Sequence, residues 1–115
     1  MPFGIAAGTV NVSNAPITPA SGQVAGAGNN TILTPDSGKH LRIFYASYNP
    51  FAAVQAAFRF GPAGTLWLVN SVVANSVIAK EFGPTRLLEG AVDESLILNL
   101  SDAVATNWTV FYEEA

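Results

Sequence analysis

The chain has 115 residues, half of them apolar and 11% charged, with a formal net charge of −3 and no cysteine. This length suits one domain with its own hydrophobic core, and so apolar a composition excludes an intrinsically disordered chain. The lack of cysteine excludes disulfides and zinc–thiolate sites, and the scattered basic residues argue against binding to nucleic acid or to a membrane surface. We expect neither a secretory signal nor a membrane-spanning segment.

The low charged fraction also sets this chain apart from a free monomer. About a quarter of the residues of an average soluble domain are charged. Because the charges here are too few to cover the outside, part of the surface is expected to be apolar or neutral. We expect partner subunits to cover some of that surface.

The first third of the chain is rich in glycine and proline. Residues 1–35 are predicted to form an extended arm and residues 36–115 a β-sandwich body. Short extended pieces are predicted at Thr9–Ser13 and Thr31–Thr34, and the alternative to an arm is an edge strand together with a disordered tail. The apolar side chains of the arm that we expect at an interface are Phe3, Ile5, Val10 and Val12.

From Lys39 onward, apolar residues recur at the period-two spacing of strands. Leu41, Ile43 and Tyr45 are predicted to share one face, and Asn49-Pro50 to end their strand. Alanine is frequent near Phe58, so a helix is the alternative there, but a strand is favoured. The predicted strands are Lys39–Tyr48, Val54–Phe60, Thr65–Val69, Ile78–Phe82, Ser95–Ser101 and Ala103–Glu113.

The whole pattern consists of about seven or eight short strands separated by turns, with no amphipathic helix between them. It predicts an all-β protein, namely an antiparallel β-sandwich or jelly roll with an extended N-terminal arm. Packing two sheets face to face would bury the inward residues of each strand between them.

Little in the sequence points to catalysis. A Ser–His–Asp triad or a cupin-type metal site would depend on His40, the single histidine, and no nucleophile elbow accompanies it. Asp93, Glu94 and Asp102 lack the spacing of an EF-hand, and Gly22–Gly28 lacks the ending of a P-loop. We therefore expect no enzyme activity, no cofactor and no bound metal.

The aromatic residues are more numerous than one face of each strand can bury. Trp108 is predicted to lie in the core, because the other residues on its face of the strand are mostly apolar. Phe44, Trp67 and Phe111 are predicted at subunit contacts, where aromatic residues are enriched. Alternatively, an exposed Tyr48 or Trp67 would stack on the sugar rings of a glycan.

Three segments carry a resemblance to a known type of protein. Residues 31–43 read Thr-Ile-Leu-Thr-Pro-Asp-Ser-Gly-Lys-His-Leu-Arg-Ile, residues 96–105 read Leu-Ile-Leu-Asn-Leu-Ser-Asp-Ala-Val-Ala, and residues 109–114 read Thr-Val-Phe-Tyr-Glu-Glu. Together they resemble small jelly-roll structural proteins of tailed bacteriophages, of the type that decorates or cements capsids. The resemblance implies a homotrimer on the capsid surface of the virion, bound to the major capsid protein, and no catalysis. It transfers no functional residue.

The first hypothesis is therefore a capsid decoration or cementing protein, made in the host cytoplasm, whose arm reaches onto the major capsid protein. Deleting residues 1–20 is then expected to abolish capsid binding and to leave the body folded. The alternatives are a glycan-binding β-sandwich module of a phage fibre or tail, and a minor head or tail structural protein or coat protein.

Overall fold

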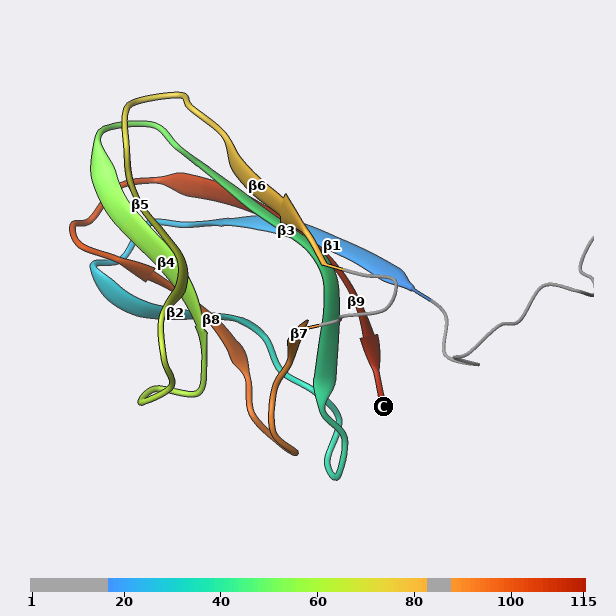
Figure 1. Cartoon of the computed structure of the whole chain (residues 1–115). Helices are drawn as coiled ribbons and strands as arrows, with labels where there is room; N and C mark the ends of the chain where they lie inside the picture. The colour runs from blue at the N-terminus through green and yellow to red at the C-terminus, as the bar shows by residue number, and fades with distance from the viewer. Residues whose placement is uncertain (1–16, 83–87) are drawn as a thin grey trace, which may run out of the picture.

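The computed structural model describes residues 17–82 and 88–115 (Figure 1). These residues form nine strands and no helix, and so the described parts of the chain hold no helix that could cross a membrane. The strands are β1 (Thr18–Val24), β2 (Gly28–Leu33), β3 (Leu41–Pro50), β4 (Val54–Phe60), β5 (Trp67–Val72), β6 (Ile78–Glu81), β7 (Leu88–Glu89), β8 (Leu96–Leu100) and β9 (Thr106–Glu114).

The strands make two antiparallel sheets whose order is that of a jelly roll (Figure 1). The first sheet has the order β1-β9-β3-β6, with β7 also paired to β3, and the second has the order β2-β8-β4-β5. The chain changes sheet at every connection except β4–β5 and β6–β7. Such Greek-key crossings between two packed sheets define the jelly roll, so the predicted fold class is confirmed.

The hydrophobic core lies between the two sheets and comes mainly from β3, β4, β8 and β9. On β4, the buried side chains include Val54, Phe58 and Phe60, as the alternation predicts, and the strand is confirmed over the helix. Trp108 of β9 is also buried, as predicted. The core residues of β8 are Leu96, Leu98 and Leu100. Removing these apolar side chains from water is the main stabilising term of the fold.

One extra residue in β3 changes which side chains face the core. Leu41 and Ile43 are fully buried, as predicted, but the register with β9 shifts between Ile43 and Tyr45. Because side chains alternate between faces, this bulge turns Tyr45 outward and brings Ala46 and Tyr48 into the core. The prediction that Tyr45 shares a face with Leu41 is wrong for this reason.

Several strand boundaries also differ from the prediction, most clearly the end of β3 and the start of β5. β3 does not end at Asn49-Pro50 but continues through Pro50, which pairs with Thr106 at the last position of the ladder. Proline is accommodated at such a terminal position, where few further ladder hydrogen bonds are needed. β5 begins at Trp67 rather than at Thr65, and it contains a bulge of its own against β4.

Part of the predicted arm belongs to the sandwich. β1 pairs with β9 along its whole length, and β2 pairs with β8, so residues 18–33 form one edge of each sheet. The body therefore starts before the boundary predicted at residue 36, as in the edge-strand alternative. An edge strand tolerates glycine and proline because one side of its backbone needs no partner. Outside the described residues lie the piece predicted at Thr9–Ser13 and the side chains Phe3, Ile5, Val10 and Val12.

Tyr48 connects the two sheets through the core. Its hydroxyl lies 2.6 Å from the carbonyl oxygen of Leu68 and 3.1 Å from that of Ala56. Leu68 sits in the bulge of β5 with a φ of 55°, a left-handed conformation that bulky residues rarely adopt. The hydroxyl therefore supplies a donor to the distorted part of β5. Burial raises the pKa of Tyr48 above its usual 10.0, and a hydrogen bond with Asn70 opposes part of this shift.

Tyr48→Phe is expected to lower the free energy of unfolding at neutral pH by about 1–3 kcal/mol, because buried carbonyl groups lose their donor. Ionisation of Tyr48 favours the unfolded chain, where its pKa is lower. The stabilisation from neutral Tyr48 is therefore retained below about pH 10 and is lost as the pH rises beyond it. Because Tyr48→Phe has no hydroxyl to ionise there, its free energy of unfolding should fall less steeply at alkaline pH than that of the wild type.

Urea unfolding between about pH 8 and pH 11 measures both effects. Tyr45→Phe, which removes a hydroxyl from the outer face, is the matched control and should change little. Equal stabilities of the two variants at neutral pH would contradict the role given to Tyr48.

Candidate interaction surface

The strand register gathers four connections at one end of the sandwich. Val24 and Pro50 both pair with Thr106 in the first sheet, and Gly28 pairs with Leu100 in the second. The connections that follow or precede these strand ends therefore lie together, at the upper left of Figure 1. We call this surface the apolar end; it consists of residues 25–27, 51–53, 73–77 and 101–105.

The apolar end exposes large hydrophobic side chains on loops, where polar residues are the rule. Phe51, Val73 and Val77 are 51%, 66% and 59% exposed. Alanines surround them in all four connections, and Asp102 is the one charged residue in these connections, each of which the structure describes completely. An exposed cluster of this kind marks a contact with another macromolecule more often than a solvated loop.

Backbone hydrogen bonds hold these connections to one another. The N–H of Asn75 donates to the carbonyl of Pro50 at 2.8 Å, and the N–H of Phe51 donates to the carbonyl of Ala105 at 2.9 Å. Asn75 has a φ of 62°, which asparagine adopts more readily than most residues. The apolar side chains are therefore presented by short, tied loops, which lowers the entropy lost when a partner binds.

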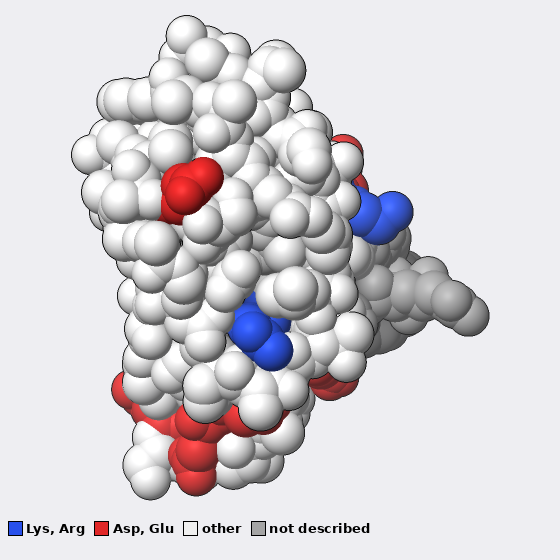
Figure 2. All heavy atoms as spheres, turned by 90° about the vertical axis from the view of Figure 1, so that its left-hand side faces the viewer, with Lys and Arg blue, Asp and Glu red and all other residues white. Residues whose placement is uncertain are grey.

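The opposite end of the sandwich carries most of the charge. Figure 2 looks at the side formed by the second sheet and shows acidic residues gathered at its lower end, below a largely uncharged surface. Arg59 is the one charged residue in the four strands of that sheet. We call the lower surface the charged end; its charged residues are Asp36, Lys39, Arg42, Glu89, Asp93, Glu94, Glu113 and Glu114.

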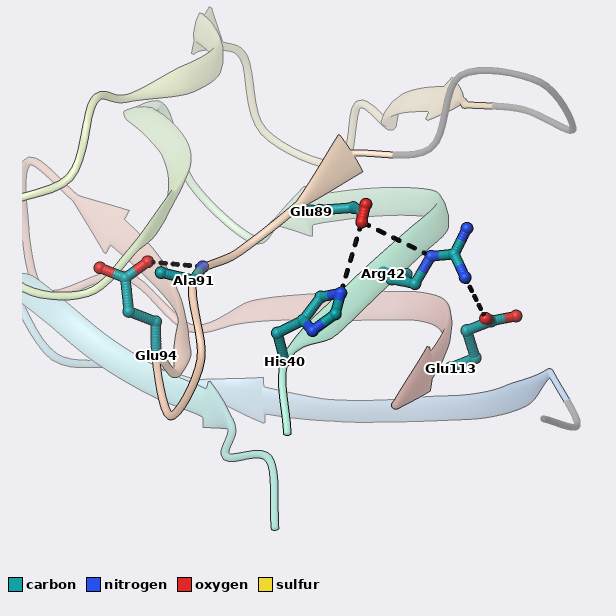
Figure 3. Close-up of polar contacts among 6 residues, drawn as sticks. All are labelled: His40, Arg42, Glu89, Ala91, Glu94 and Glu113. Atoms are coloured by element: carbon teal, nitrogen blue, oxygen red, sulfur yellow. Dashed lines mark hydrogen bonds and ion pairs between the residues drawn. The ribbon is translucent and has the colours of Figure 1, made fainter. Parts of the chain in front are cut away.

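Carboxylates at the charged end hold the loops in place. Glu114 accepts the N–H of Asp36 at 2.6 Å, and Asp93 accepts the N–H of Gly38 at 2.7 Å. Glu94 accepts the N–H of Ala91 at 3.0 Å (Figure 3). Each contact is a charge-assisted hydrogen bond to a loop or turn, so these carboxylates stabilise the loops of the chain itself.

An ionic cluster on the outer face of the first sheet continues the charged end (Figure 3). Arg42 pairs across the ladders with Glu113 on one side and Glu89 on the other. Its guanidinium lies 2.9 Å from the Glu113 carboxylate, which is 1% exposed, and 3.7 Å from that of Glu89. His40 Nε2 lies 3.3 Å from the same Glu89 oxygen. The single histidine thus borders an ion-pair network at a strand end.

The acidic residues do not assemble into the calcium site weighed from the sequence. Asp102 lies at the apolar end, whereas Asp93 and Glu94 lie at the charged end, so that combination is wrong. Within residues 17–82 and 88–115, no three residues of the histidine, cysteine, aspartate and glutamate types are grouped to hold a metal ion.

The aromatic residues predicted at subunit contacts lie in different places. Phe111 is 40% exposed on the outer face of the first sheet, beside Tyr45 at a ring distance of 5.2 Å. Trp67 instead stacks on Phe58 at 4.9 Å, at the edge of the core. Phe44 is half-buried at the β3 bulge. The structure therefore does not join them into one patch, and their interface roles stay predictions.

The sequence interpretation assigned none of the three large residues of the apolar end to an interface. Phe51, Val73 and Val77 lie between strands, where periodicity assigns no face. A usable signal was present: apolar residues continue through segments flanked by turn-forming residues, as in Asn49-Pro50-Phe51. Nothing in the sequence alone showed that connections far apart in the chain meet at one end.

Comparisons with known proteins add little beyond a weak likeness in fold. No protein-family model matches the chain, and no curated protein does. Among solved structures, the fold is similar to a chain in the cryo-EM structure of the extra small virus particle of the giant freshwater prawn Macrobrachium rosenbergii, with a TM-score of 0.47 and 12% identity over 99% of this chain and 88% of that one. So weak a likeness carries no conclusion about function, and the jelly roll is assigned from the strand order.

Arg42→Gln is expected to lower the free energy of unfolding by about 1.5–3 kcal/mol, because the buried carboxylate of Glu113 loses a charge-assisted hydrogen bond. Lys39→Gln removes the same charge from an exposed position and should change stability by less than about 0.5 kcal/mol. Urea unfolding at neutral pH compares the two variants. An Arg42→Gln protein as stable as Lys39→Gln would show that the cluster does not stabilise the fold.

Proposed function

We propose that this chain is a virion structural protein that decorates or cements a capsid by binding its major capsid protein, and that it is not an enzyme. The observation that carries the proposal is the apolar end: Phe51, Val73 and Val77 are exposed on tied, nearly uncharged loops. Such a surface is more typical of a protein that contacts other subunits than of a protein that stays monomeric.

The fold narrows the alternatives without deciding between them. Jelly rolls serve as viral capsid domains, lectins and cupins, and a fold by itself does not give a function. A cupin-type metal centre uses several histidines, whereas the single His40 here contacts Glu89. A structural role is supported instead by acids that accept hydrogen bonds from turns and by a second sheet whose strands carry one charged residue, Arg59.

The glycan-binding alternative loses the residues on which it was based. Tyr48 is 1% exposed, with its hydroxyl directed to backbone carbonyls inside the core. One face of Trp67 stacks on Phe58, and Phe82 meets the Trp67 ring edge-on at 5.5 Å. Tyr48 is therefore buried away from any sugar, and the Trp67 ring is already packed against other aromatic rings, so nothing observed favours a glycan over a protein partner.

A decoration protein benefits from the properties that this chain combines. A rigid sandwich keeps its contact surfaces at fixed angles, and a shell presents the same binding site many times in closed symmetry. Modest contacts then add up through multivalency. In this proposal the protein is a homotrimer on the capsid surface, and residues 1–16 reach the major capsid protein.

Co-sedimentation with capsids assembled from the major capsid protein of the same genome tests this function. Saturable binding at a stoichiometry set by the capsid symmetry is the expected result. Deleting residues 1–16 should weaken binding at least tenfold without lowering the thermal unfolding midpoint. The deletion stops there because Thr18–Val24 form β1, and removing residues 1–20 would damage the sheet.

Two results would contradict the proposal in different ways. Full-affinity binding by the shortened chain would remove the role of residues 1–16 and leave a capsid-binding body. No binding by the intact chain, under conditions where it is folded, would remove the decoration function itself.

A further inference from the structure

We infer that the apolar end is the surface through which copies of this chain contact one another in a closed oligomer, with their charged ends pointing apart. The inference deepens the proposed function and rests on its claim that copies associate. It assigns that contact to Phe51, Val73 and Val77 rather than to Phe44, Trp67 and Phe111, the residues predicted from the sequence.

The chemistry of the apolar end suits a close contact between protein surfaces. Burying Phe51, Val73 and Val77 removes apolar area from water, and Asp102 is the one charged residue in the four connections. The alanines around them let two backbones approach closely. Several backbone N–H groups of these loops already have partners, as in the bonds from Asn75 to Pro50 and from Phe51 to Ala105, so these groups lose no hydrogen bond on contact.

The distribution of charge selects a second copy in one orientation. At the charged end, acidic residues outnumber the basic residues Lys39 and Arg42, so two copies meeting there would repel each other. A head-to-tail contact would bury carboxylates such as Asp93 and Glu114 against an apolar surface, at a high desolvation cost. Contact between apolar ends leaves these charges in water, and a self-complementary surface of this kind closes around a symmetry axis.

The apolar end is less suited to contact with a membrane than to contact with a second copy of the chain. Peripheral attachment to anionic lipid uses lysine and arginine around the inserted side chains. The four connections of the apolar end contain neither, and Asp102 would face the lipid headgroups. Protein–protein contact therefore fits the observed residues better.

The test uses the full-length chain and light scattering coupled to size-exclusion chromatography. The wild type should elute as an oligomer whose mass is a multiple of 12.0 kDa, three times that value for the proposed trimer. Val73→Asp and Phe51→Asp each place a charge in the contact and should weaken self-association at least tenfold, giving monomers. Val92→Asp is the matched control, because Val92 is 56% exposed in the connection before β8, at the charged end, and its oligomer should persist.

Circular dichroism establishes that each variant is folded, and two separate substitutions keep the test valid if one of them unfolds. Oligomers that survive both substitutions, or that dissociate equally with Val92→Asp, would overturn the inference. A wild-type chain that is monomeric but binds phosphatidylcholine vesicles through Phe51 would also overturn it. If both variants are monomeric as expected but the wild-type oligomer never binds capsids, the inference stands and only the decoration function is rejected.

Discussion

The ladder between β3 and β9 is the constraint on which the rest of the structure depends. It runs from the pair of Leu41 with Glu114 to the pair of Pro50 with Thr106, and so it spans the sandwich from the charged end to the apolar end. The same ladder sets Arg42 beside Glu113 on the outer face. Its single bulge decides which residues of β3 enter the core, because a shift of one residue exchanges the two faces.

The separation of apolar and charged ends follows from this register. Since the strands are antiparallel, every connection falls at one end or the other, and the residues of four connections become neighbours without being near in sequence. Acids at one end accept hydrogen bonds from turns, as Asp93 does from Gly38. The other end holds its loops with backbone bonds and leaves apolar side chains outside. This asymmetry is what makes an oriented assembly reasonable.

The sequence predicted the parts of the fold that depend on local alternation. β4, β8 and β9 were located because apolar residues recur at every second position on one face of each strand, with Trp108 on the buried face. The bulge at Tyr45 left no trace in the pattern, because an inserted residue is defined only by its partner strand. β1 was read as part of an arm because an edge strand carries few apolar residues. The apolar end was missed because its residues meet only through the register.

The central claim is that apolar ends face each other in the assembled protein, and cysteine cross-linking tests it most directly. The chain contains no cysteine, so single cysteines can be introduced at Ala74 in the apolar end and at Ser37 in the charged end, both of which are exposed. Under mild oxidation, Ala74→Cys is predicted to form covalent dimers and Ser37→Cys to remain uncross-linked on a denaturing gel. Cross-links at Ser37→Cys without cross-links at Ala74→Cys would contradict the proposed arrangement.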